Sequence, residues 1–309
     1  TTITQMKKRQ DANHEKTRNL ERLKGKENIT QSGQKIDICA NIGNREDIEN
    51  VIRSDAGGIG LFRSEFLYME NGGKLPTEEQ QFQTYKLAAE SMGIKRVVIR
   101  TADLGGEKQA ACFEIGPEKN PSMGYRGIRV SLEKEDMFKT QLRAILRASV
   151  YGNVAIMFPM ISTVEEVRSA KLLLERAKKE LSAEKTAYNK EIQVGVMIET
   201  PAAVMISGEL AREVDFFSIG TNDLTQYILV VDRGNKKIAK MYDYFNPAVV
   251  RAIKQVIEAG HKEGIKVGMC GEMAGDQKAV ELLLDLGLDE FSMSAGSIDY
   301  VREQILNRE

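Results

Sequence analysis

Two carboxylates and an amide stand just past apolar runs of the kind that form buried strands. Glu199 directly follows the run 193–198, and Asn222 and Asp223 follow the run 215–219. Their side-chain oxygens are hard donors that suit Mg²⁺, an ion that keeps several waters and accepts oxygens of a phosphate-bearing substrate. A single carboxylate in such a place could equally cap a helix. The pair Glu199 and Asp223, at the exits of successive strands, favours a magnesium site.

Basic residues gather at the exits of the other apolar runs. Arg63 ends the second run, Arg100 ends the third and Arg233 lies beyond the sixth, while the long segment 101–133 adds Lys108 and Arg126. Each guanidinium presents a planar fork that matches phosphate and carboxylate oxygens. One such arginine could serve a surface salt bridge, but several at the same end of successive strands predict a site for a small, multiply charged anion.

A thiol completes the set. Cys270 lies in the glycine-flanked segment 268–275, at the exit of the seventh apolar run. A lone cysteine is often a small buried apolar residue, but this position places it at the mouth of the predicted site. Because an ordinary thiol has a pKa near ~8.5, it is mostly protonated at neutral pH and can act as a general acid.

Other residues of reactive types lack such a setting. Cys39 and Cys112 are interpreted as structural, and Arg129 as a support for the nearby helix. His14 lies in a charged N-terminal helix and His261 near the end of a later helix, and neither has a partner at metal-ligand spacing. We therefore expect both histidines to be structural or exposed to solvent.

The elements that position these residues alternate regularly. Two capping boxes, Thr77 with Gln80 and Thr163 with Glu166, mark helix starts. Eight strands followed by eight helices predict a (β/α)₈ TIM barrel of the α/β class, whose sites lie at the carboxyl ends of the strands. A doubly wound open sheet is less consistent with a site spread over so many strands. The expected strands are 36–42, 57–62, 96–100, 153–160, 193–198, 215–219, 266–270 and 289–293, and the expected helices are 45–54, 77–92, 134–150, 163–182, 202–213, 247–263, 276–286 and 297–307.

Composition narrows the class of protein. The chain has 309 residues and a net charge of −1, which gives no general attraction to nucleic acid or an anionic membrane. It contains no apolar stretch of the ~18 residues that a spanning helix needs, and three cysteines without paired spacing predict a reducing, cytoplasmic setting. Residues 1–27 are interpreted as a helical linker and 28–309 as the barrel. Because the first residue is Thr1 rather than Met, we expect a piece of a longer protein.

Several segments, in one order, resemble a known family. They closely resemble the C-terminal, phosphoenolpyruvate (PEP)-binding domain of enzyme I of the bacterial phosphotransferase system, over essentially the whole chain. The resemblance also extends to pyruvate phosphate dikinase and PEP synthase, although 231–235 and 269–273 look more like enzyme I. The segments are 60–68, 100–108, 120–126, 197–200, 220–227, 231–235 and 268–276.

The resemblance implies a role for each candidate residue. It implies that Glu199 and Asp223 hold Mg²⁺ and that Cys270 protonates C3 of the enolate of pyruvate. The residues implied to bind PEP are Arg63, Arg100, Asn222, Asp223 and Arg233, with Arg126 and Lys108 as supporting contacts.

The resemblance also implies partners. In this family the phosphoryl acceptor is a histidine of a separate N-terminal domain, which later passes the group to the phosphocarrier protein HPr, and the barrel forms a homodimer. Neither His14 nor His261 matches the acceptor segment. The expected function is therefore phosphoryl donation from PEP to that absent domain, with release of pyruvate, as the first step of a sugar phosphotransferase relay. The alternatives are the barrel of a dikinase or synthase, or a PEP sensor without catalysis.

Overall fold

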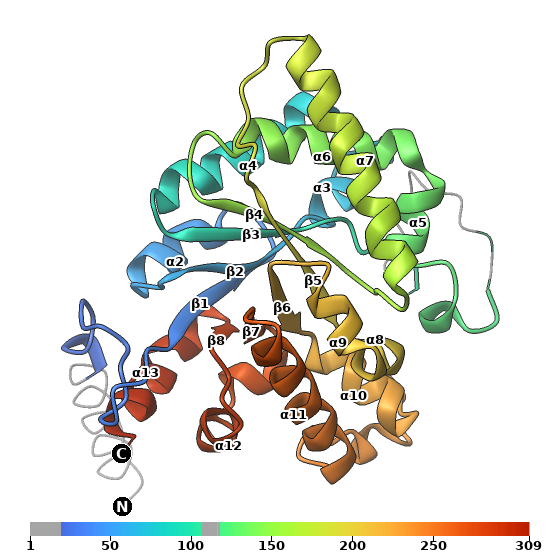
Figure 1. The fold of residues 1–309 in the computed structure, drawn as a ribbon. Helices are drawn as coiled ribbons and strands as arrows, with labels where there is room; N and C mark the ends of the chain where they lie inside the picture. Colours follow the sequence, from blue (N-terminus) through green and yellow to red (C-terminus); the bar gives the residue numbers. More distant parts are fainter. Residues whose placement is uncertain (1–19, 107–115, 117, 309) are drawn as a thin grey trace, which may run out of the picture.

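Eight parallel strands close into a single barrel in the order β1 to β8 (Figure 1). The computed structural model describes residues 20–106, 116 and 118–308. The predicted (β/α)₈ barrel is confirmed, because each strand pairs in parallel with the next and β8 closes on β1. The strands are β1 (Asp37–Ile42), β2 (Gly58–Arg63), β3 (Arg96–Arg100), β4 (Val154–Phe158), β5 (Gln193–Ile198), β6 (Phe216–Ile219), β7 (Lys266–Met269) and β8 (Glu290–Met293).

Helices surround the barrel and connect its strands (Figure 1). Both predicted capping boxes are present, at Thr77 and at Thr163. The α-helices are α2 (Asp47–Arg53), α3 (Phe66–Met69), α4 (Glu78–Met92), α5 (Ile128–Glu133), α6 (Glu135–Ala148), α7 (Val164–Ala183), α8 (Pro201–Met205), α9 (Ser207–Ala211), α10 (Thr221–Leu229), α11 (Pro247–Lys262), α12 (Val280–Asp285) and α13 (Ile298–Asn307). Short 3₁₀ turns occupy Pro121–Met123, Ala239–Met241, Glu272–Gly275 and Ala295–Ser297.

Some helix predictions were wrong in detail. The helix expected at 202–213 is divided into α8 and α9, because Ile206 leaves the helical region with a ψ of 22°. The residues Asn222 and Asp223, which follow the sixth strand, lie in the first turn of a helix that was not predicted, α10. The short helices α3, α5 and α10 were not predicted, since too few turns are available for a clear apolar periodicity.

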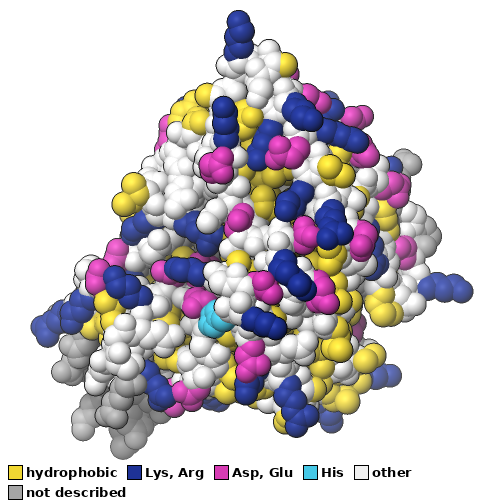
Figure 2. Space-filling view, viewed as in Figure 1, with side chains coloured by type: hydrophobic (Ala, Val, Ile, Leu, Met, Phe, Trp, Pro, Cys, Tyr) yellow, Lys and Arg dark blue, Asp and Glu magenta, His cyan; other side chains and the backbone are white. Residues whose placement is uncertain are grey.

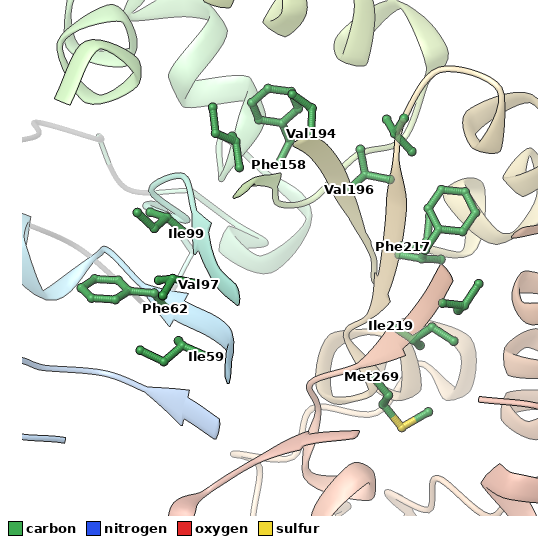
Figure 3. Close-up of a cluster of buried hydrophobic side chains, with 14 of the residues drawn as sticks. Ile59, Phe62, Val97, Ile99, Phe158, Val194, Val196, Phe217, Ile219 and Met269 are labelled. Atoms are coloured by element: carbon green, nitrogen blue, oxygen red, sulfur yellow. The ribbon is translucent and has the colours of Figure 1, made fainter. Parts of the chain in front are cut away.

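Side chains alternate between the two faces of the strands. The larger buried cluster lies between strands and helices and includes the side chains drawn in Figure 3, such as Ile59, Val97 and Phe217. A smaller cluster forms from the intervening positions and fills the barrel interior: Leu61, Val98, Ala155, Met157, Met197, Phe216 and Cys270. The interior is therefore packed at this level, and Leu61, Met197 and Cys270 of this cluster also line a cavity at the carboxyl end of the barrel.

The described part of the expected linker, residues 20–27, packs beside α13 (Figure 1). Leu20 is buried, the Gly25 amide donates to Asp55 at 2.7 Å, and Lys24 lies 3.9 Å from Asp299. The face of the molecule in Figure 2 intermingles basic and acidic side chains. Within the described residues, none of the helices combines the length and the apolar character that membrane crossing requires.

Candidate functional site

A cavity of about 370 Å³ opens at the carboxyl end of the barrel. It brings together seven of the residues predicted from the sequence: Arg63, Arg100, Arg126, Glu199, Asn222, Asp223 and Arg233. Cys270 also lines it, so one space is shared by cations, carboxylates and a thiol. A wider cavity of about 1010 Å³ adjoins it and shares Arg63, Asn222 and Cys270. The lining of the wider cavity includes residues at or just after the ends of β1, β7 and β8, such as Asn41, Gly271 and Ser294.

Arg100, the last residue of β3, is buried and paired with acidic groups. Its Nη2 donates to Glu65 and lies 3.4 Å from an oxygen of Asp103. Burial acts to lower the pKa of this guanidinium, but the two carboxylates and Glu199 raise it. The side chain is therefore a fixed, fully charged cation at the floor of the cavity.

Arg126 is held between two carboxylates. Its Nε and Nη2 each donate to Asp103 at 3.0 Å, while Nη1 and Nη2 donate to the two oxygens of Asp223 at 3.1 and 2.9 Å. The Tyr227 hydroxyl accepts a further bond from Nη1 at 3.3 Å. Arg126 thus spans the cavity from the segment after β3 to the first turn of α10.

Glu199 follows β5 and is almost fully buried. Its Oε1 accepts a hydrogen bond from the Met160 amide at 2.7 Å. Burial, followed by the charges of Asp223 and Asp103, raises the pKa of this carboxyl to about 8, against the influence of Arg100 and Arg126. Gly220 allows this approach, because an added Cβ there would lie 2.9 Å from the Glu199 Cβ. The charged form of Glu199 is therefore unfavourable in the free protein, and a bound cation would stabilise it.

Asn222, Arg233 and Glu272 form a second polar group at the cavity rim. Glu272 Oε1 accepts from Arg233 Nη1 at 2.7 Å and from Asn222 Nδ2 at 3.2 Å. The Glu272 amide in turn donates to Asn222 Oδ1 at 2.8 Å. Arg233 and Glu272 are both largely exposed, so either side chain can readily leave the other and bind a different partner.

Cys270 lies directly after β7 and is buried. Its amide donates to the Ile219 carbonyl at 3.1 Å, and its own carbonyl accepts from Asn41 Nδ2 at 2.9 Å. Burial raises the pKa of the thiol to about 11, although Ser218 and Arg100 oppose the rise. The thiol is therefore protonated at neutral pH, as a proton donor must be.

Arg63 differs from the other three arginines. It ends β2, is exposed, and lines both cavities. Among the described residues it has no carboxylate within salt-bridge distance, whereas Arg100, Arg126 and Arg233 each have at least one. Its guanidinium is free to meet an incoming anion.

The donor set fits a magnesium ion that shares its ligands with a substrate. Within the described ranges there is no group of three or more His, Cys, Asp or Glu side chains that could enclose a metal alone. Glu199 and Asp223 supply two carboxylates in the cavity, and the charge of Asp223 acts on the pKa of Glu199. Magnesium is commonly bound by one or two carboxylates, with water and substrate phosphate completing its octahedron.

The described residues interpreted as structural do not line the cavity at the carboxyl end of the barrel. His261 pairs with Asp289 at 2.8 Å, next to the amino end of β8 and so at the opposite end of the barrel. Arg129 donates to backbone carbonyls of residues 123 and 124, and Cys39 is buried. The predictions for His14, Lys108 and Cys112 fall outside the described residues.

Three acidic residues of the site were missed. Glu65, Asp103 and Glu272 each pair with a cavity arginine. They lie two or three residues from Arg63, Arg100 and Cys270 in the sequence. This closeness in the sequence could have revealed them, because an arginine that is buried at the end of a strand needs an acidic partner nearby.

Comparison with known proteins gives a family match over most of the chain. Residues 17–309 match the family described as "PEP-utilising enzyme, PEP-binding domain". A phosphoenolpyruvate-protein phosphotransferase of Staphylococcus aureus is 51% identical over 286 residues, which are 93% of this chain and 50% of that protein. One from Priestia megaterium is 51% identical over 284 residues, 92% of this chain and 49% of that protein. The chain thus spans about half the length of these relatives.

Among solved structures, the fold is shared more widely than the sequence. An HpcH/HpaI aldolase/citrate lyase family protein from Burkholderia cenocepacia superposes with a TM-score of 0.54 at 16% identity, covering 92% of this chain and 95% of that one. This likeness supports the barrel alone. The family match over nearly the whole chain and the close relatives decide the classification: the chain belongs to the PEP-utilising enzymes, as their PEP-binding domain.

Proposed function

We propose that this domain binds PEP together with Mg²⁺ and donates its phosphoryl group to a histidine of a separate domain, releasing pyruvate. The observation that carries the proposal is the single cavity in which four arginines, three carboxylates and one protonated thiol meet at the carboxyl end of the barrel. The names of the relatives, at 51% identity, favour this reaction over that of a dikinase or synthase.

Substrate binding follows from the charges. PEP carries roughly −1.5 to −2 on its phosphate near neutral pH, and its carboxylate adds a further negative charge. Arg63 has no carboxylate partner among the described residues and would be the first to contact the anion. Arg100 and Arg233 would exchange or share their present carboxylates, and Asn222 would add an amide donor from the first turn of α10.

Glu199 and Asp223 would hold the magnesium ion, whose chemical contribution is to neutralise charge on the transferring phosphoryl group. Both side chains lie in the cavity. The arginines would stabilise the same charge from the other sides, because fixed cations in a partly desolvated site act more strongly than in water.

Cys270 would supply the proton. When the phosphoryl group leaves PEP, the other product is the enolate of pyruvate, and its C3 must gain a proton to become the methyl group. The thiol S–H bond breaks as the new C–H bond forms, leaving a thiolate beside Arg100 and Arg63, whose charges lower its pKa. A site that only senses PEP does not need a proton donor, so the presence of Cys270 argues against that function.

The acceptor histidine would come from another domain. His261 is paired with Asp289 at the far end of the barrel, and relatives are twice as long as this chain. The phosphorylated histidine would pass its group to HPr in a sugar phosphotransferase relay. A homodimer and a cytoplasmic location remain predictions from the family resemblance, and sedimentation of the chain tests the first.

A reconstitution experiment tests the proposal. The chain is mixed with PEP, Mg²⁺ and the N-terminal histidine domain of a relative, and pyruvate is followed by coupling to lactate dehydrogenase. We expect no pyruvate from the chain alone and a slow release when the domain is added, since free domains lack the millimolar effective concentration of tethered ones. Phosphorylation of His261 in the isolated chain, or no pyruvate in the complete mixture, would contradict the proposal.

A further inference from the structure

Arg126 engages both oxygens of Asp223, one of the two carboxylates assigned to the metal. The two distances, 3.1 and 2.9 Å, describe a bidentate pair in which guanidinium donors occupy the lone pairs that a cation would use. The other arginine pairs of the cavity do not involve an assigned metal ligand, since Arg100 pairs with Glu65 and Arg233 with Glu272.

Arg126 is also fixed from behind. Asp103, which is fully buried, accepts two further bonds from the same guanidinium at 3.0 Å. The backbone of Arg126 forms a β-bridge with Gly105, where an added Cβ would lie 2.1 Å from the Tyr125 carbonyl. The close approach requires glycine and holds the arginine segment against the exit of β3. Asp103 therefore anchors Arg126, and Asp223 is the partner that can be exchanged.

A cation that approaches Asp223 on the face used by Arg126 must displace these donors. If the metal arrived alone, the guanidinium would keep Asp103 as its only carboxylate and would lie close to a second, divalent charge. A phosphate-bearing substrate changes this balance, because its oxygens can accept the hydrogen bonds that Asp223 gives up. The exchange is favourable only when metal and anion enter together.

We propose that Arg126, Asp103 and Asp223 form an ionic lock that makes metal binding at Asp223 depend on the phosphate-bearing substrate. The inference rests on the proposed function, in which Asp223 is a metal ligand. Because coupling between two ligands is reciprocal, the same lock makes substrate affinity depend on the metal. Arg126 is thus a positioning residue that sets the order and cooperativity of binding.

Binding of Mn²⁺, used in place of Mg²⁺ and followed by electron paramagnetic resonance, tests the lock without any turnover. For the wild-type chain we expect PEP to tighten Mn²⁺ binding at least about tenfold, within the usual range of coupling between sites. For Arg126→Gln we expect Mn²⁺ alone to bind about tenfold more tightly than to wild type, and the effect of PEP to fall below about threefold.

Three matched variants separate the lock from general electrostatics. Arg233→Gln removes one charge from the same cavity without touching Asp223, and should change the affinity for Mn²⁺ alone much less than Arg126→Gln does. Arg129→Gln, in the same segment but bonded only to backbone carbonyls, should behave as wild type. Arg126→Lys keeps the charge but loses the fork, and should lie between wild type and Arg126→Gln.

The outcomes are distinct. If wild type shows the coupling and Arg126→Gln keeps it, the lock is wrong while the proposed function stands. The lock is equally excluded if Arg126→Lys behaves as wild type, because charge alone would then explain the effect. If no variant binds Mn²⁺ even with PEP, the metal assignment fails and the lock fails with it. Thermal melts check folding, and if Arg126→Gln does not fold, Arg126→Lys decides.

Discussion

Replacing Glu199 by glutamine should stabilise the free protein while removing its metal-dependent function. The side chain is buried, and its Oε1 accepts the Met160 amide at 2.7 Å, a bond that the glutamine carbonyl can keep. The substitution therefore removes a charge with little change of shape. In the free protein that charge is unfavourable, because burial and the neighbouring Asp223 and Asp103 raise the pKa of the carboxyl from 4.5 to about 8.

The size of the effect follows from proton linkage. A pKa difference of one corresponds to about 1.4 kcal/mol between the two protonation states, so the rise from 4.5 to about 8 sets an upper limit of roughly 5 kcal/mol. Water entering the open cavity reduces this, and we expect about 2–4 kcal/mol. The stability linked to Glu199 is fully present below pH about 4.5 and is lost as pH rises to about 8, since the folded state holds the proton that the unfolded chain has released.

Urea unfolding without added metal measures this directly. Glu199→Gln should exceed wild type by about 1 kcal/mol near pH 5.5 and by about 2–4 kcal/mol above pH 8. Glu258→Gln serves as the control and should show no such trend, because Glu258 is exposed and pairs with Lys254 at 3.7 Å on the surface of α11. A Glu199→Gln variant that is less stable than wild type, or equally stable at every pH, would refute the argument that the free carboxylate is destabilised.

Three further predictions concern two other groups of the cavity and one buried arginine outside it. Cys270→Ala should keep PEP affinity within about threefold but lower reconstituted turnover by about 10²–10⁴-fold. Alkylation of the wild-type thiol, followed by peptide mass spectrometry, should become faster as pH rises, with a midpoint near pH 11. A midpoint near 9 would show that the thiol is not buried in solution. Calorimetry should show that Glu272→Gln binds PEP severalfold more tightly, because Arg233 no longer has a competing carboxylate. The free energy of unfolding should change by less than about 1 kcal/mol. Weaker binding would mean that Glu272 positions Arg233 instead. Arg302→Ala should lower the free energy of unfolding by about 3–5 kcal/mol, since this buried arginine holds Asp299 at 2.7 Å, and a smaller loss in urea would show that water replaces it.

The barrel and most of the candidate site could be predicted from the sequence. Strand exits are marked by abrupt changes from apolar to polar residues, and in a barrel every exit lies at one end. Residues such as Arg63, Arg100 and Glu199 were therefore placed together without knowledge of any distance. The capping boxes at Thr77 and Thr163 were equally visible, because each depends on two residues of fixed spacing.

The pairings within the site could not be predicted. Which carboxylate meets Arg126 depends on how the segment after β3 returns to the barrel, and Asp103 and Asp223 lie 23 and 97 positions from it in the chain. Short helices such as α10 were not predicted for a related reason, because a helix of 9 residues shows little periodicity of apolar residues. Long-range geometry, rather than local preference, decides both.

Calorimetric titration of PEP into the chain, with Mg²⁺ and then with a chelator, tests the central claim most directly. The cavity combines four arginines with three carboxylates, two of which are assigned to the metal. The account predicts saturable binding with Mg²⁺ that weakens about tenfold or more when the metal is removed. Absence of PEP binding at saturating Mg²⁺, or equal affinity with and without the metal, would contradict it.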